Sequence, residues 1–144
     1  MVRYDFSLKD FREDDMHLSG KFFVASLILS AGTAASTAQE IKAIPLEPGD
    51  KSYMLLLNGP PETKSFRSGV VTLEPGKSVG VHNSGVNEEI LVPLEGQGEL
   101  QFSNHPSVTI KPGMITYAPA HSEHNVLNTG SGRLRYIFIT ARAE

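Results

Sequence analysis

The order of apolar and polar residues from position 52 onward indicates a succession of short β-strands. Runs rich in Val, Ile, Leu, Phe, Tyr and Thr alternate with segments rich in Gly, Pro and Asn, which form turns. None of the runs is long enough for a helix, and their regular spacing predicts an all-β sandwich or barrel. The predicted strands cover residues 52–57, 66–73, 90–94, 99–103, 108–110, 115–118, 125–128 and 134–140.

One proline constrains this pattern. Pro93 falls inside the predicted strand 90–94. Because proline has no N–H to donate to a neighbouring strand, it predicts an edge position or a bulge at this point.

The first 38 residues differ from the rest of the chain. Their apolar part, residues 22–29, is too short to span a bilayer, which takes about 20 apolar residues. Lys21 precedes this part, and small residues ending at Ala38 follow it, which is the order of a secretory signal peptide. We therefore expect a signal peptide over 16–38 and a periplasmic or secreted domain over 39–144, with no stable membrane span.

An acidic leader, residues 1–15, precedes the signal-like segment, although the start of a signal peptide is expected to be basic. If translation begins at Met16, residues 16–21 become an ordinary short basic start, and the leader is an artefact of start-site choice. The alternative is an N-terminal arm whose short apolar helix packs on the domain or on a partner subunit.

Composition narrows the chemistry that is open to the domain. The chain has 144 residues, a formal net charge of −3 and no cysteine. The absence of a basic surplus argues against nucleic acid or an anionic membrane as the partner. The absence of cysteine excludes disulfides, thiolate metal sites and cysteine nucleophiles, so any chemistry depends on His, Asp, Glu and hydroxyl groups.

Three of the four histidines after residue 38 fall in two segments that each begin with glycine. The residues that define the segments are Gly76, His82, Glu89 and Gly96 in the first and Gly113, Pro119, His124 and Asn128 in the second. These segments resemble the paired motifs of the cupin superfamily, and all eight residues match the family's spacing. The resemblance covers residues 52–140. It implies a small single-domain protein of the cupin-2 type, folded as a double-stranded β-helix or jelly-roll barrel.

The resemblance assigns the family's metal ligands to His82, Glu89 and His124. Two imidazoles and one carboxylate suit a divalent transition metal such as Fe, Mn, Ni, Zn or Cu rather than Ca or Mg. The family pattern has a second histidine where this chain has Ser84, and a glycine where it has His121. Because side chains alternate along a strand, position 84 is expected to face the same side as His82, which makes Ser84 a vacant ligand position.

Three interpretations of the incomplete ligand set are open. The metal keeps two histidines and one glutamate, and water or substrate fills the vacancy. Alternatively, His121 moves in from its loop to replace the lost ligand. In the third interpretation the site holds no metal, and the three residues bind a polar ligand directly.

Further residues are candidates for roles beside the ligands. Glu89 is the candidate catalytic base, whereas its neighbour Glu88 is expected to face solvent on the opposite side of the strand. The aromatic and polar residues expected to wall the pocket are Phe102, Tyr117, Tyr136 and Asn128.

Two classes of function follow. In the first, the chain is a metal-dependent enzyme that acts on a small polar organic molecule in the barrel mouth; the resemblance allows isomerase, lyase and dioxygenase chemistry. In the second, it is a metal-free, non-catalytic binding module for a carbohydrate or a small acid. The resemblance also implies a homodimer, because pairing two copies covers an exposed sheet edge.

Overall fold

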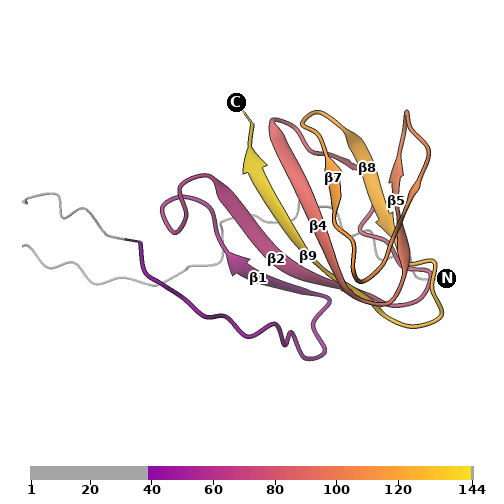
Figure 1. Ribbon diagram of the computed structural model, residues 1–144, viewed down its shortest axis with the longest axis horizontal. Coiled ribbons are helices and arrows are strands. Elements are labelled where there is room, and N and C mark those ends of the chain that lie inside the picture. The colour runs from indigo at the N-terminus through magenta and orange to yellow at the C-terminus, as the bar shows by residue number, and fades with distance from the viewer. Residues whose placement is uncertain (1–38, 144) are drawn as a thin grey trace, which may run out of the picture.

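The computed structural model describes residues 39–143, and this part of the chain is built from β-strands without a helix (Figure 1). The strands are β1 (Tyr53–Leu57), β2 (Phe66–Leu73), β3 (His82–Asn83), β4 (Asn87–Glu95), β5 (Gly98–Phe102), β6 (Val108–Ile110), β7 (Thr116–Ala118), β8 (Glu123–Leu127) and β9 (Leu134–Arg142). The all-β prediction is confirmed. Eight strands lie where the apolar runs placed them, and β3 was not predicted.

The predicted leader, 1–15, and the predicted signal peptide, 16–38, lie outside the described residues. Among the residues that are described, no helix offers the length of apolar chain needed to cross a membrane.

The strands form two antiparallel sheets. The five-stranded sheet has the order β1-β2-β9-β4-β7, and the four-stranded sheet has the order β3-β8-β5-β6. In Figure 1 the long strands β2, β9 and β4 run side by side, although β9 is the last strand in the sequence. Such pairing of distant strands is the jelly-roll, or double-stranded β-helix, connection, and it brings residues from both ends of the domain to one place.

The hydrophobic core lies between the two sheets. In β2 and β9 it uses every second residue, as expected for strands with one buried face. Burial of each large aliphatic side chain stabilises the fold by about 1.5–3 kcal/mol. The core side chains are Val71, Leu73, Leu91, Leu100, Ile110, Val126, Leu134 and Tyr136.

The strand register places a polar row at one end of the five-stranded sheet. Glu89 of β4 lies opposite Thr140 of β9, which in turn lies opposite Arg67 of β2. The next row toward the core contains Phe138 beside Gly69. A Cβ atom on Gly69 would lie 2.7 Å from Cε1 of Phe138, so only glycine allows this ring to lie against β2. The inner face of the sheet therefore changes from apolar to polar at this end.

Pro93 marks an irregularity in β4, and the predicted bulge is confirmed. The register between β4 and β9 shifts between Pro93 and Glu95. On the other side, β7 pairs only with Glu89, Ile90 and Leu91. Pro93 thus lies beyond the end of β7, where the missing N–H costs no ladder hydrogen bond.

Candidate metal centre

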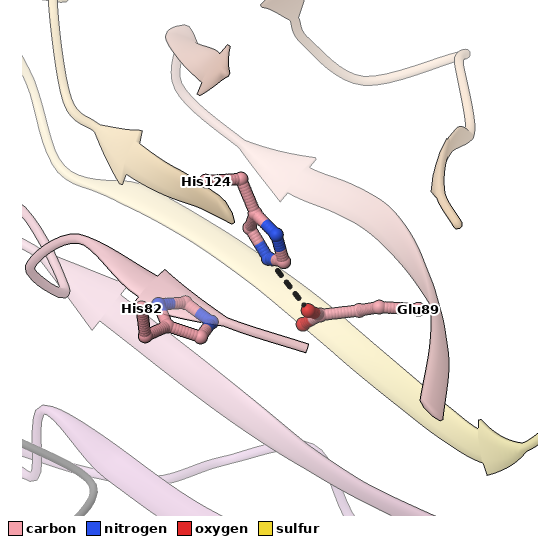
Figure 2. Close-up of side chains that lie close together, drawn as sticks. All are labelled: His82, Glu89 and His124. Atoms are coloured by element: carbon pink, nitrogen blue, oxygen red, sulfur yellow. Dashed lines mark hydrogen bonds and ion pairs between the residues drawn. The ribbon is translucent and has the colours of Figure 1, made fainter. Parts of the chain in front are cut away.

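Three side chains from three strands converge at the polar end of the barrel. His82 of β3 lies directly opposite His124 of β8, and the centroids of their rings are 4.4 Å apart. Glu89 reaches them from β4 in the other sheet, and its Oε2 is hydrogen-bonded to Nε2 of His124 at 2.9 Å (Figure 2). The structure therefore brings together the three residues that the sequence motifs singled out as ligands.

The three potential ligand atoms lie close enough together to form a candidate metal site. One potential ligand atom from each of the three residues lies within 4.8 Å of the others. Metal bonds to nitrogen and oxygen of about 2.0–2.2 Å place adjacent ligand atoms about 3 Å apart and opposite ones about 4.2 Å apart. The distance of 2.9 Å between Glu89 and His124 is that of adjacent ligands. His124 and Glu89 are also well shielded, with 1% and 12% of their side chains exposed.

In both imidazoles Nδ1 faces a backbone carbonyl oxygen, so Nε2 is the nitrogen that is placed to bind a metal. Nδ1 of His82 lies 3.0 Å from the carbonyl oxygen of Gly80, and Nδ1 of His124 lies 3.3 Å from that of Ser122. A carbonyl oxygen only accepts, so each Nδ1 is placed to donate a proton to it, and a bound metal would take the place of the proton that Nε2 of His124 shares with Glu89. Figure 2 shows both rings directed toward the Glu89 carboxylate. The three side chains thus supply the donor types of a divalent transition-metal site.

The site opens onto a cavity of about 140 Å³ between the sheets. Its wall is mostly apolar, and His82, Glu89 and Arg67 supply charged or titratable groups. The residues that line it are Ser52, Tyr53, Arg67, Val71, Leu73, Ser78, Val79, His82, Glu89, Val126, Tyr136 and Phe138.

Tyr136 adds a hydroxyl donor to this cavity. Its burial, and secondarily the nearby carboxylate of Glu89, raise the pKa of the Tyr136 phenol well above its usual range. The phenol therefore keeps its proton at neutral pH, and Tyr136 lines the same cavity as Glu89.

Ser84 does not face the three site residues, which corrects the expectation of a vacant ligand position there. Its hydroxyl donates to the carbonyl oxygen of Pro119 at 3.0 Å and accepts from the N–H of Ser122 at 3.0 Å. The alternation argument fails because β3 ends at Asn83, so position 84 is no longer in a strand. Ser84 instead holds the loop that leads into β8.

The structure does not bring His121 to the three candidate ligands, so its role as a substitute ligand stays a prediction. Its side chain is exposed, and it is not part of the group of ligand atoms found within residues 39–143. Its backbone adopts a φ of 59° while its N–H donates to the carbonyl oxygen of Gly85 at 2.6 Å. This left-handed conformation explains why a glycine suits the position.

The pocket prediction for Tyr117 is also wrong. Tyr117 lies opposite Ile90 in the β4–β7 pair, and it is 53% exposed. Its hydroxyl donates to Oε1 of Glu88 at 2.6 Å, and this hydrogen bond raises the pKa of Tyr117. Tyr117 and Glu88 thus share the outer face of the sheet. Glu88 therefore points away from Glu89.

Asn128 and Phe102 lie near the barrel interior but outside the cavity wall. Asn128 is 1% exposed and bonds only to backbone: its Nδ2 donates to the carbonyl oxygens of Leu73 and Gly132. Its expected pocket role is therefore wrong. The centroid of the Phe102 ring lies 6.0 Å from that of the His124 ring, and the two planes are tilted by 52°.

Arg67 and Tyr53 line the cavity although sequence reasoning passed over both. A signal for Arg67 was present: it has the same strand parity as the buried Val71 and Leu73, in a run with no other charged residue. Because side chains alternate along a strand, the Arg67 side chain is expected on the same inward face as Val71 and Leu73.

Comparison with known protein families identifies the class of protein that has this antiparallel β-barrel and a His/His/Glu group at its mouth. A family model described as the cupin domain matches residues 69–140, half of the chain. The chain belongs to this family, which confirms the resemblance. No curated protein gives a significant match.

Solved structures share the fold at low sequence identity. A double-stranded β-helix protein from Klebsiella pneumoniae is 17% identical with a TM-score of 0.61, covering 73% of this chain and 93% of that one. The cupin domain of Schizosaccharomyces pombe Cnp3 is 23% identical with a TM-score of 0.57, covering 62% of this chain and 63% of that one. A structure of DMSP lyases is 23% identical with a TM-score of 0.54, covering 63% of this chain but only 47% of that one.

Proposed function

We propose that the barrel binds a divalent transition metal through His82, Glu89 and His124, and that a small polar organic molecule occupies the adjoining cavity. The convergence of three ligand atoms within 4.8 Å, at the edge of a cavity, carries this proposal. Support comes from the carbonyl oxygens behind both imidazoles, because such partners fix ring orientation in metal sites.

The residues around the candidate metal centre have different chemical roles in this proposal. A bound metal supplies Lewis-acid chemistry, polarising an oxygen of the molecule beside it. Tyr136 offers an O–H donor, and Glu89 can accept a proton through the carboxylate oxygen that does not bond to His124. The apolar wall, including Val71 and Val126, excludes water and strengthens these polar contacts.

Metal content tests the proposal. The full-length chain is produced without a histidine tag, reconstituted separately with Fe, Mn, Ni and Zn, and its bound metal is measured by mass spectrometry. About one equivalent is expected, falling to background in His82→Ala and His124→Ala. Less than about a tenth of an equivalent with every metal would refute it.

His121→Gly is the matched control for these variants. It also removes a histidine near the site, but one that is exposed and outside the ligand group. It should keep the full metal content; loss of metal would instead show that His121 is a ligand.

A metal-free binding module is the second candidate, and one observation favours it. Glu89 and His124 already satisfy each other through their hydrogen bond of 2.9 Å. Under this proposal the reconstituted chain holds no metal yet still binds a small acid or carbohydrate, which calorimetry on the same samples decides.

We also propose that the chain is exported and that the barrel forms a homodimer. Support for export is the signal-like order of residues 16–38, and support for pairing is the sheet edge at β1. Intact mass of the protein from fractionated cells tests cleavage after Ala38, and light scattering tests the dimer. Uncleaved protein in the cytoplasm would refute export.

A further inference from the structure

Arg67 carries a positive charge into the cavity beside the candidate metal centre. It lies in one row with Thr140 and Glu89, so its backbone is two strand spacings, about 10 Å, from that of Glu89. Both side chains line the same cavity. The guanidinium and the candidate metal centre thus stand at two sides of one small space.

The guanidinium of Arg67 is only partly satisfied by hydrogen bonds within the described part of the chain. Nη2 of Arg67 donates to the hydroxyl of Tyr53 at 3.2 Å, and its Nε–H is shielded from solvent without a hydrogen-bond partner. No ion pair within the described part of the chain involves Arg67. A guanidinium held only by a neutral hydroxyl in a largely apolar cavity favours an anion as its partner.

Aromatic packing holds the guanidinium in place. The rings of Tyr53 and Phe138 stack with centroids 6.0 Å apart, and Phe138 in turn lies against Gly69. Tyr53 is therefore a rigid acceptor for Arg67, which lowers the entropy lost when a ligand binds.

We infer that the cavity binds a small organic carboxylate whose carboxylate group pairs with Arg67 and whose second oxygen faces His82 and Glu89. The planar fork of a guanidinium matches a carboxylate. The cavity of about 140 Å³ is well below the roughly 300–1,000 Å³ of pockets for drug-sized ligands, so the molecule is compact. The second half of the inference rests on the proposed function: a divalent ion beside one glutamate leaves a net positive charge there as well.

Propionate and propionamide test the Arg67 contact. They have nearly the same shape, and only propionate is charged. In ligand-observed NMR titrations of the full-length chain, propionate should bind and propionamide should bind at least tenfold more weakly. Arg67→Gln should weaken propionate binding by about ten- to a hundredfold, the range for hydrogen bonds to a charged group.

Arg133→Gln is the matched control, because it removes the same charge from an exposed side chain outside the cavity. It should bind propionate like the unmodified chain. Two further variants serve if Arg67→Gln fails to fold. Arg67→Lys keeps the charge without the fork and should lose several-fold in affinity, as should Tyr53→Phe, which removes the partner of Nη2. Equal binding of propionate and propionamide, or unchanged propionate binding in all Arg67 variants, would overturn the inference.

Lactate separates this inference from the proposed metal site. Its hydroxyl supplies a second oxygen, so it should bind more tightly than propionate to the metal-loaded chain and about equally after chelation. If the chain takes up no metal but Arg67 still selects propionate, the metal proposal fails and the carboxylate contact stands. If metal binds and Arg67 has no effect, the reverse holds. Metal content of Arg67→Gln should equal that of the unmodified chain.

Discussion

Asn128 offers a sharp test of the structure, because its buried amide makes three hydrogen bonds to backbone groups. Its Nδ2 donates to the carbonyl oxygens of Leu73 at 2.8 Å and Gly132 at 2.9 Å, and its Oδ1 accepts from the N–H of Gly130 at 2.9 Å. Asn128→Ala removes all three hydrogen bonds. At about 0.5–1.5 kcal/mol each, the free energy of unfolding should fall by about 1.5–4.5 kcal/mol. That is a large share of the roughly 5–15 kcal/mol of a typical domain.

Urea unfolding followed by circular dichroism measures this loss, and a thermal melt gives a second value. A loss near 3 kcal/mol corresponds to a Tm lower by about 12–24 °C for a domain of this size. Below the unfolding midpoint the variant should bind metal normally, because Asn128 does not line the cavity. A change in stability below about 0.5 kcal/mol, or a folded variant without metal binding, would refute the reasoning.

Asn128→Asp provides the matched comparison, since it keeps the shape but turns the donor into a carboxylate facing two carbonyl oxygens. At pH 7 it should be at least as unstable as Asn128→Ala. Its folded-state pKa should be raised, so stability should recover as the pH falls and a carboxyl proton restores one donor. Equal stability of the Asp variant across pH 4–8 would contradict this geometry.

Three further predictions follow from single residues. His121→Gly should raise the free energy of unfolding by about 0.5–1 kcal/mol in urea unfolding, because it relieves a left-handed φ of 59°; a loss of stability would contradict it. Ser84→Ala should cost about 1–2 kcal/mol by leaving the N–H of Ser122 without its acceptor, yet leave metal content unchanged; loss of metal would restore Ser84 to the ligand set. Tyr117 should ionise above its usual pKa of 10 in an NMR titration, and Glu88→Gln should return it toward 10. Because this folded-state pKa is raised, the Tyr117–Glu88 bond stabilises the fold below pH 10 and is lost as the pH rises through the folded pKa; an unshifted Tyr117 would refute the bond.

The strands and the three candidate ligands could be predicted from the sequence because both are periodic features. Alternation located eight strands, and the fixed spacing of His82, Glu89 and His124 located the site. The strand β3 escaped prediction because two residues cannot show an alternation.

The residues around the ligands could not be predicted for a different reason. Ser84 and His121 lie in loops, where side-chain direction follows from turn conformation and not from strand parity. Asn128 follows the last residue of β8, so its orientation depends on the turn that it braces. Tyr117 was misplaced because the face of a three-residue strand is set by its pairing with β4.

The candidate metal centre joins the two halves of the barrel. Glu89 belongs to the five-stranded sheet, whereas His82 and His124 belong to the four-stranded sheet. A metal ion bound by all three residues would link the two sheets, which at this end are also joined by the hydrogen bond between Glu89 and His124. At a free metal concentration of 100 times Kd, metal binding would add about 2.7 kcal/mol to the stability of the folded barrel. Metal loading would then raise the free energy needed to separate the two sheets at this end of the barrel.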